Sequence, residues 1–363
     1  MNQPVRVLVV DDSALMRKLI PQILETDSSI EVVGTAMDGN FGLKKIAELN
    51  PQVITLDLEM PGMGGLDMLR EIMQRHRLPV IVVSSYSTKG ASVTLQALSL
   101  GAFDFVAKPG DAASRMQENG QELIAKIKAA AQSRGIQIAS PRDFSESMRR
   151  KKVQSPANRR ATRIIAIGVS TGGPQSLQYV LSQLPADFPG CIVVVQHMPE
   201  GFTEMFARRL NDCSPLNIKE AQSGDILHPG RVLICPGSRH LKVKRLPLGD
   251  VAVLSDEPRV NGHRPSADVL FKSVAEEFGS RGVGVIMTGM GDDGAHALGL
   301  IKAAGGTTIA QSEQTCVVFG MPKAAIERGH AMRIVDLQAM ASMLQAQCLE
   351  QAAPTRAMGA SQV

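Results

Sequence analysis

Short apolar runs alternate with amphipathic stretches along the first third of the chain. The runs have strand length and read VRVLVV (5–10), EVVGTA (31–36), VITLDLEM (53–60), LPVIVVSS (78–85) and AFDFVAKP (102–109). Between them lie segments with helical periodicity, and the first places six apolar side chains on one face: Leu15, Met16, Leu19, Ile20, Ile23 and Leu24. Strands that alternate with helices of this length predict a doubly wound parallel α/β sheet.

A second alternation of the same kind begins near residue 162. Its apolar runs are RIIAIGVS (163–170), CIVVVQH (191–197), RVLICPG (231–237), VAVLSD (251–256), GVGVIMTG (282–289) and TTIAQS (307–312). We predict two α/β domains, 1–134 and 161–349, the second mainly parallel. A polar linker at 135–160, which contains two prolines, joins them, and a flexible tail follows at 350–363.

Composition narrows the classes of protein to which the chain can belong. No apolar run approaches the roughly 18 residues of a membrane span, and the five cysteines lack the spacing of a zinc site or a disulfide framework. The net charge of +4 comes from the linker, where seven Lys and Arg against two acidic residues give +5, which leaves −1 elsewhere. These features predict a reduced, cytoplasmic protein with no membrane insertion and no nucleic-acid surface.

Polar residues follow the strands of the first domain at the edge where ligands of such sheets bind. Asp11 and Asp12 come directly after the first strand, Asp57 follows the third, Ser84 ends the next, and Lys108 follows the last. Carboxylates suit a hard divalent cation, and a lysine and a hydroxyl suit a phosphoryl group. We expect Asp11 and Asp12 to hold Mg²⁺ and Asp57 to accept a phosphoryl group.

These residues, with VLVVDDS, ITLDLEMPGMGG, VVSS and FVAKP in register, resemble the response-regulator receiver domain of two-component signalling. The resemblance implies a flavodoxin-like fold, Mg²⁺-dependent phosphorylation of Asp57 and a metal site of Asp11, Asp12 and Asp57. It also implies a conformational switch through Ser84 and Phe105, with Lys108 contacting the phosphoryl group. A receiver is a control module, so the output function lies in the second domain.

A glycine-bounded serine follows the first strand of the second domain. Ser170 lies in GVSTGGP (168–174), a strand-to-helix turn that exposes a nucleophile and places it near a helix N-terminus. His197 follows the next strand, and Asp292 and Asp293 follow GVGVIMTGMG at the same edge. This placement predicts a Ser–His–Asp arrangement. The chain order Ser, His, Asp differs from the Ser, acid, His order of the α/β-hydrolase fold.

We assign no further binding role to three other groups of residues. GMGDDG (289–294) fits a dinucleotide fingerprint, but Asp292 and Asp293 would face the pyrophosphate, so a nucleotide site is disfavoured. His228, His240 and His296 lack metal-ligand spacing and are expected to be structural or surface groups. His263 and Arg264 lie in a polar loop. Contact with the substrate helix is one interpretation of this pair, and a solvated loop is the one we favour.

At the level of longer motifs, the second domain resembles the catalytic domain of the CheB family of chemotaxis protein-glutamate methylesterases. The resemblance rests on IGVSTGGP, VVVQHMP, HPGRVLICPG, NGHRPSADVLF and MTGMGDDGA, and on the order receiver, linker, esterase. It implies Ser170 as nucleophile, His197 as general base and Asp293 as the acid that orients the histidine. It further implies that the Met290 backbone amide lies near the oxyanion and that Thr171 supports the site by hydrogen bonding. Asp292 stands where the family often has Asn, which makes the local field more negative.

The resemblance also implies function and partners. The substrates would be glutamyl γ-methyl esters and selected glutamines of methyl-accepting chemotaxis receptors, hydrolysed without a cofactor. The phosphodonor would be the chemotaxis histidine kinase, and the unphosphorylated receiver would restrict access to the esterase site. We expect a monomer, because no feature demands a dimer. Two alternatives stay open: a transcriptional regulator, which the lack of a basic recognition helix disfavours, and a non-catalytic adaptor that binds receptors.

Overall fold

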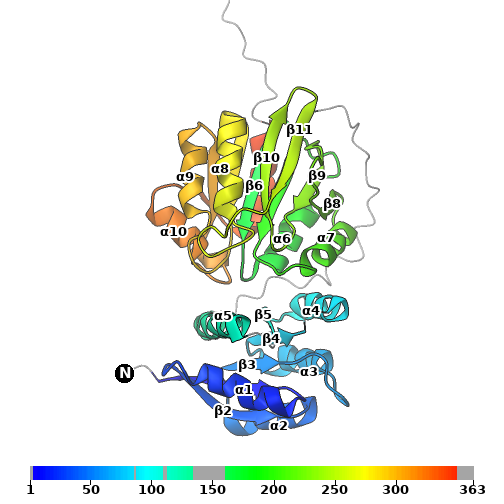
Figure 1. Ribbon diagram of the computed structural model, residues 1–363, viewed down its shortest axis with the longest axis vertical. Coiled ribbons are helices and arrows are strands. Elements are labelled where there is room, and N and C mark those ends of the chain that lie inside the picture. The colour runs from blue at the N-terminus through cyan, green and yellow to red at the C-terminus, as the bar shows by residue number, and fades with distance from the viewer. Residues whose placement is uncertain (1–2, 86, 109–112, 134–159, 350–363) are drawn as a thin grey trace, which may run out of the picture.

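The computed structural model describes residues 3–85, 87–108, 113–133 and 160–349 (Figure 1). The predicted tail at 350–363 and all of the predicted linker except Arg160 lie outside the described residues. No helix within the described ranges is long and apolar enough to cross a lipid bilayer.

The described part of the N-terminal domain forms a five-stranded parallel sheet in the order β2-β1-β3-β4-β5. The strands are β1 (Val5–Val10), β2 (Ile30–Ala36), β3 (Val53–Leu56), β4 (Val80–Ser84) and β5 (Asp104–Ala107). The helices are α1 (Ala14–Leu24), α2 (Gly39–Leu49), α3 (Gly65–Glu71) with its π-helical continuation η1 (Ile72–His76), α4 (Thr88–Leu100) and α5 (Ala113–Gln132). Each strand falls within or beside a run predicted from the hydrophobic pattern.

The described part of the C-terminal domain contains a seven-stranded parallel sheet in the order β14-β13-β12-β6-β7-β9-β8. Its strands are β6 (Ile164–Val169), β7 (Cys191–Gln196), β8 (Asn217–Glu220), β9 (Arg231–Ile234), β12 (Gly282–Ile286), β13 (Thr307–Gln311) and β14 (Arg333–Val335). The helices are α6 (Gly173–Gln183), α7 (Phe202–Cys213), α8 (Ala267–Phe278), α9 (Ala295–Ala303), α10 (Met321–Glu327) and α11 (Leu337–Leu349), with short 3₁₀ turns η3 (Gly279–Arg281) and η4 (Glu313–Thr315).

The central strands of this sheet explain why the sequence shows continuous apolar runs. Every residue of β6, β7 and β12 is buried, since a parallel sheet is covered on both faces. The run VAVLSD differs, because it lies in β11 (Gly249–Ser255), which pairs antiparallel with β10 (His240–Leu246) outside the main sheet. The predicted fold class, two α/β domains with a mainly parallel second sheet, is confirmed.

The two domains pack through α4 and β5 of the first and α6 and α7 of the second (Figure 1). One hydrophobic cluster includes Leu95 and Leu98 of α4 together with Phe206 and Leu210 of α7. The Gln175 side chain on α6 donates hydrogen bonds to the carbonyl oxygens of Leu98 and Ala102 at 2.6 and 3.0 Å. The interface therefore joins apolar packing with hydrogen bonds that cross between the domains.

Candidate functional site

Ser170 lies in a tight turn between β6 and the N-terminus of α6. Its amide donates to the Thr288 carbonyl at 3.0 Å, and its carbonyl accepts from the Gly173 amide at 2.8 Å. Gly172 has a φ of +76°, and a Cβ there would lie 2.5 Å from the Val317 Cβ. The turn thus requires glycine on both counts, as expected for an exposed nucleophile beside a helix N-terminus.

His197 follows β7, the strand next to β6, and its amide donates to the Val169 carbonyl at 3.2 Å. The neighbouring Gln196 side chain donates to the Ser170 carbonyl at 3.0 Å. The carboxyl ends of the two strands are thereby held together, and the side chain of His197 is 11% exposed. The structure brings the predicted serine turn and the predicted histidine to the same edge of the sheet.

Asp293 is fully buried in the loop between β12 and α9, and its Oδ2 lies 2.8 Å from the His197 Nε2. The α8 N-terminus surrounds this carboxylate: the Ser266 hydroxyl donates to Oδ1 at 2.6 Å and the Ala267 amide to Oδ2 at 2.7 Å. Burial alone would raise the pKa of Asp293. The hydrogen bond and charge of His197, with these donors, outweigh burial and hold the pKa below its ordinary value.

The second ring nitrogen of His197 has a different environment. Its Nδ1 is buried, and no hydrogen bond satisfies it within the described part of the chain. Because Nε2 is engaged by Asp293, Nδ1 is the nitrogen left to accept a proton. The imidazole is therefore held by a hydrogen bond at Nε2, while Nδ1 has no hydrogen bond to any described residue and can accept a proton, as a general base requires.

Met290 and Thr171 frame the serine turn. Gly289, which precedes Met290, packs so closely on Ser170 that a Cβ there would lie 2.9 Å from the Ser170 Cβ. Thr171 is buried, and its carbonyl accepts from the Thr288 hydroxyl at 2.9 Å. The backbone around Met290 is thus adjacent to Ser170, while Thr171 contributes to the site through its main chain.

Asp292, which the sequence analysis expects to make the local field more negative, has two polar partners in the structure. The Asn261 amide nitrogen donates to its Oδ1 at 2.8 Å, and the Arg328 guanidinium to its Oδ2 at 2.5 Å. These two hydrogen bonds, in that order of importance, lower the pKa of Asp292. The extra carboxylate is neutralised by an arginine 36 positions away, which the sequence pattern does not indicate.

His263 is also placed differently from the expectation of a solvated loop residue. Its ring stacks on that of His197, with ring centroids 3.9 Å apart and an interplanar angle of 7°. Sequence reasoning missed this contact because the loop has no hydrophobic period. The other histidines fit the prediction, since buried His240 bonds the Pro258 carbonyl and His296 is exposed.

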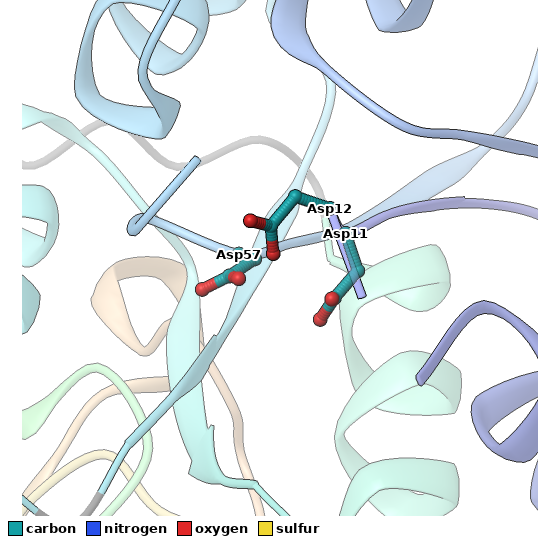
Figure 2. A group of neighbouring side chains, drawn as sticks. All are labelled: Asp11, Asp12 and Asp57. Atoms are coloured by element: carbon teal, nitrogen blue, oxygen red, sulfur yellow. The ribbon is translucent and has the colours of Figure 1, made fainter. Parts of the chain in front are cut away.

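Asp11, Asp12 and Asp57 converge at the carboxyl edge of the receiver sheet (Figure 2). Each offers a carboxylate oxygen, and these oxygens lie within 4.8 Å of one another. Asp11 and Asp57 are buried, and burial is the main reason why the pKa of each is raised, although Lys108 acts in the opposite direction. The Asp11 Oδ2 is buried, and the Lys108 ammonium lies 3.3 Å from it. Three carboxylates that converge at one point, with a single ammonium between two of them, fit a divalent cation such as Mg²⁺.

Lys108, Ser84 and Phe105, the other predicted receiver residues, have different partners. The Lys108 ammonium lies 2.6 Å from the Asp57 Oδ2 and 3.3 Å from the Asp11 Oδ2. Ser84 is buried and accepts a hydrogen bond from the Thr94 hydroxyl at 2.6 Å, a partner on α4 that the sequence did not indicate. The Phe105 ring lies at the domain interface, where it stacks on Phe202.

Both domains match known families. Residues 7–119 match the family model of the response regulator receiver domain, and residues 165–344 match that of the CheB methylesterase. The chain is 60% identical over 353 residues to protein-glutamate methylesterase/protein-glutamine glutaminase 2 of Koribacter versatilis, covering 96% of this chain and 97% of that one. It is 45% identical to the protein-glutamate methylesterase/protein-glutamine glutaminase of Symbiobacterium thermophilum, covering 94% and 97%.

A solved structure supports the match of the second domain. The crystal structure of the Thermotoga maritima CheB methylesterase catalytic domain is 42% identical to the aligned part of this chain, with a TM-score of 0.50. The aligned region covers 51% of this chain and 98% of the chain in the crystal structure. The similarity therefore extends over a whole catalytic domain.

Proposed function

The chain belongs to the CheB family of response regulators, the protein-glutamate methylesterases/protein-glutamine glutaminases, and we propose that it removes γ-methyl groups from glutamyl esters of chemotaxis receptors and deamidates receptor glutamines. Its partners are then methyl-accepting receptors as substrates and a chemotaxis histidine kinase as phosphodonor. A cytoplasmic location and a monomeric state go with this proposal.

The proposed chemistry starts at Ser170. Its hydroxyl oxygen attacks the ester carbonyl carbon while its proton passes to His197 Nδ1, the nitrogen that Asp293 leaves open. Asp293 stays charged and stabilises the imidazolium. The carbonyl oxygen becomes an oxyanion, which backbone amides near Met290 and the α6 N-terminus stabilise. Each such donor contributes about 3 kcal/mol to the transition state.

The tetrahedral intermediate then collapses to an acyl-enzyme. The methoxy oxygen takes the proton from His197 and leaves as methanol. Water attacks the ester between the glutamyl carbonyl and Ser170, His197 removes a proton from that water, and Ser170 regains a proton as the glutamate leaves. With a glutamine side chain the same steps release ammonia. The residues required for hydrolysis all come from this chain.

Control of the esterase is assigned to the receiver. Mg²⁺, held by Asp11, Asp12 and Asp57, would supply charge neutralisation for phosphoryl transfer to Asp57. Lys108 lies 2.6 Å from the accepting carboxylate and is placed to contact the added oxygens. Two contacts couple the phosphorylated end of the sheet to the interface. Ser84 bonds to Thr94 on α4, and Phe105 stacks on Phe202.

The interface supports restriction of the site by the unphosphorylated receiver. Val317 packs against the hydrophobic cluster of the receiver, and the same side chain lies against Gly172 in the serine turn. Separation of the domains would free the loop that carries Val317 and admit a receptor helix. Phosphorylation would shift the population toward that open arrangement.

The observation that carries the proposal is the His197 Nε2 to Asp293 contact of 2.8 Å beside the glycine turn of Ser170. A fluorophosphonate probe reacts with serines activated by a general base. We expect it to label Ser170 in the full chain and to fail with His197→Gln. Ser182→Ala should keep the label, because the Ser182 hydroxyl on α6 bonds to the Tyr179 carbonyl of the same helix. Absence of label on the wild-type chain activated with beryllofluoride would contradict a serine mechanism.

A further inference from the structure

The ring of His263 covers one face of the His197 ring. The two imidazoles are nearly parallel, at 7°, with centroids 3.9 Å apart. His263 belongs to the segment between β11 and α8, and that helix holds Asp293 at its N-terminus. Both members of the His197–Asp293 pair are therefore in contact with neighbouring parts of one segment, residues 258–267.

This segment is anchored at both ends by a single buried histidine. His240 Nε2 donates to the Pro258 carbonyl at 3.0 Å, and His240 Nδ1 accepts from the Ser266 amide at 3.2 Å. His240 is fully buried on β10, so the two ends of the segment cannot drift apart without breaking a core contact. The backbone that carries His263 is thus clamped rather than free.

The middle of the segment is a tight turn with its own anchor. Asn261 and Gly262 have φ values of +51° and +76°, and Val260 and His263 exchange both backbone hydrogen bonds at 3.0 and 2.9 Å. Asn-Gly is the pair that such turns favour. Asn261 also donates to Asp292, the residue before Asp293, at 2.8 Å. The turn is thereby tied to the loop that carries the triad carboxylate.

The surroundings of His263 favour its neutral form. Burial is the main reason why the pKa of His263 is lowered, to about 4, and the neighbouring His197 and Arg259 lower it further. Asp293 and the receiver residue Glu122 raise this pKa, but by less. A neutral ring adds no positive charge beside the imidazolium that forms on His197 during acyl transfer. The stack can then constrain the base without opposing its protonation.

We propose that His263 is a positioning residue of the esterase, whose flat ring holds the His197 imidazole in the plane that directs Nδ1 toward Ser170. It takes no proton and touches no substrate atom in this role. A general base displaced by about 1 Å can cost on the order of 100-fold in rate, so loss of the ring should lower kcat while leaving receptor binding intact. The inference rests on the proposed function and adds a residue to its site.

The test measures kcat and KM for methanol release from methylated receptor helices by the full chain activated with beryllofluoride. His263→Ala should lower kcat roughly 10- to 100-fold with KM within about 2-fold. His263→Phe keeps a flat ring without nitrogen atoms and should restore kcat to within a few-fold. Asn261→Ala loosens the turn and should lower kcat in the same direction with less effect. His296→Ala, an exposed histidine on α9, is the matched control.

Two results would overturn the inference. Wild-type kcat in His263→Ala would show that the stack has no role, and equal loss in the Ala and Phe variants would show that the ring nitrogens are required. If the wild-type chain releases no methanol, the proposed function fails instead, and the rate of fluorophosphonate labelling of Ser170 in the same variants still tests the stack. If His263→Ala fails to fold, the Phe and Asn261→Ala variants decide by the same kcat comparison.

Discussion

Phe105 of the receiver stacks on Phe202 of the catalytic domain, with ring centroids 4.9 Å apart and an interplanar angle of 13°. Phe105 lies on β5, whose carboxyl end is next to the proposed phosphorylation cluster, and Phe202 begins α7, five positions after His197. The stack therefore joins the receiver strand assigned to the switch with the segment that carries the proposed general base. A movement of Phe105 on phosphorylation would therefore displace Phe202, at the edge of the proposed esterase site.

The hydrogen bonds of Gln175 across the interface give the first prediction. Gln175→Ala removes the two bonds to Leu98 and Ala102, which together stabilise the closed arrangement by about 1 to 3 kcal/mol. The open population, and with it methanol release without phosphodonor, should rise roughly 5-fold or more. The fragment that begins at Arg160 sets the upper limit for this rise.

Gln183→Ala is the matched control, because the amide of Gln183 bonds to Tyr179 within the same helix. Its unphosphorylated activity should equal that of the wild type. If Gln175→Ala and the Arg160 fragment were both no more active than the unphosphorylated full chain, restriction by the receiver would be wrong.

Asp293, the carboxylate of the proposed triad, gives the second prediction. Asp293→Asn keeps the shape of the side chain but removes the charge that orients and stabilises the protonated His197, so kcat/KM should fall on the order of 10⁴-fold. Asp292→Asn should lose at most a few-fold, because the amide oxygen can still accept from Asn261 and the exposed pair with Arg328 contributes little. Steady-state methanol release compares the two variants, and similar losses in both would contradict the assignment of Asp293.

Phosphorylation gives the third prediction. Asp57→Asn cannot take a phosphoryl group, so a small phosphodonor with Mg²⁺ should stimulate the wild-type chain and leave the variant at its basal rate. Asp67→Asn, at an exposed carboxylate paired with Arg70, should keep full stimulation. Stimulation that survives in Asp57→Asn would place the phosphorylation site elsewhere.

The stacked histidine gives a prediction for stability. Burial is the main reason why the pKa of His263 is about 4 in the folded chain against an ordinary 6.5, and the ionisable groups around it are His197, Asp293, Glu122 and Arg259. Between pH 6.5 and pH 4 the unfolded chain binds a proton that the folded chain does not, so folding stability falls through this window as the pH drops.

His263→Phe lacks this titration. Its melting temperature relative to that of the wild-type chain should therefore be higher at pH 5 than at pH 7. Thermal unfolding followed by circular dichroism at the two pH values measures the difference. An equal difference at pH 5 and pH 7 would show that His263 titrates as it does in the unfolded chain.

The sequence predicted the parts of the site that lie at strand ends. Ser170, His197 and Asp293 each follow a buried apolar strand, and parallel strands bring their carboxyl ends to one edge, so the three positions could be placed together. The same reasoning placed Asp11, Asp12 and Asp57. The fold follows from the same hydrophobic alternation, which is why it could be predicted over both domains.

The contacts that the sequence did not reveal involve polar residues far apart in the chain. Arg328 neutralises Asp292 from the end of α10, and Gln175 points from α6 to another domain. His263 lies in a loop without periodicity, clamped by His240 on a hairpin outside the main sheet. Such contacts depend on how helices and loops pack in three dimensions, and no local pattern encodes them.

Methanol release from methylated receptor helices, with and without beryllofluoride on Asp57, tests the central claim most directly. The wild-type chain should release methanol at a rate that the beryllofluoride raises severalfold, and Ser170→Ala should lose activity by roughly 10⁴-fold or more in both conditions. That variant should still accept a phosphoryl group on Asp57. Near wild-type turnover by Ser170→Ala would refute the serine mechanism, and no release from the folded wild-type chain in either condition would favour a receptor-binding adaptor.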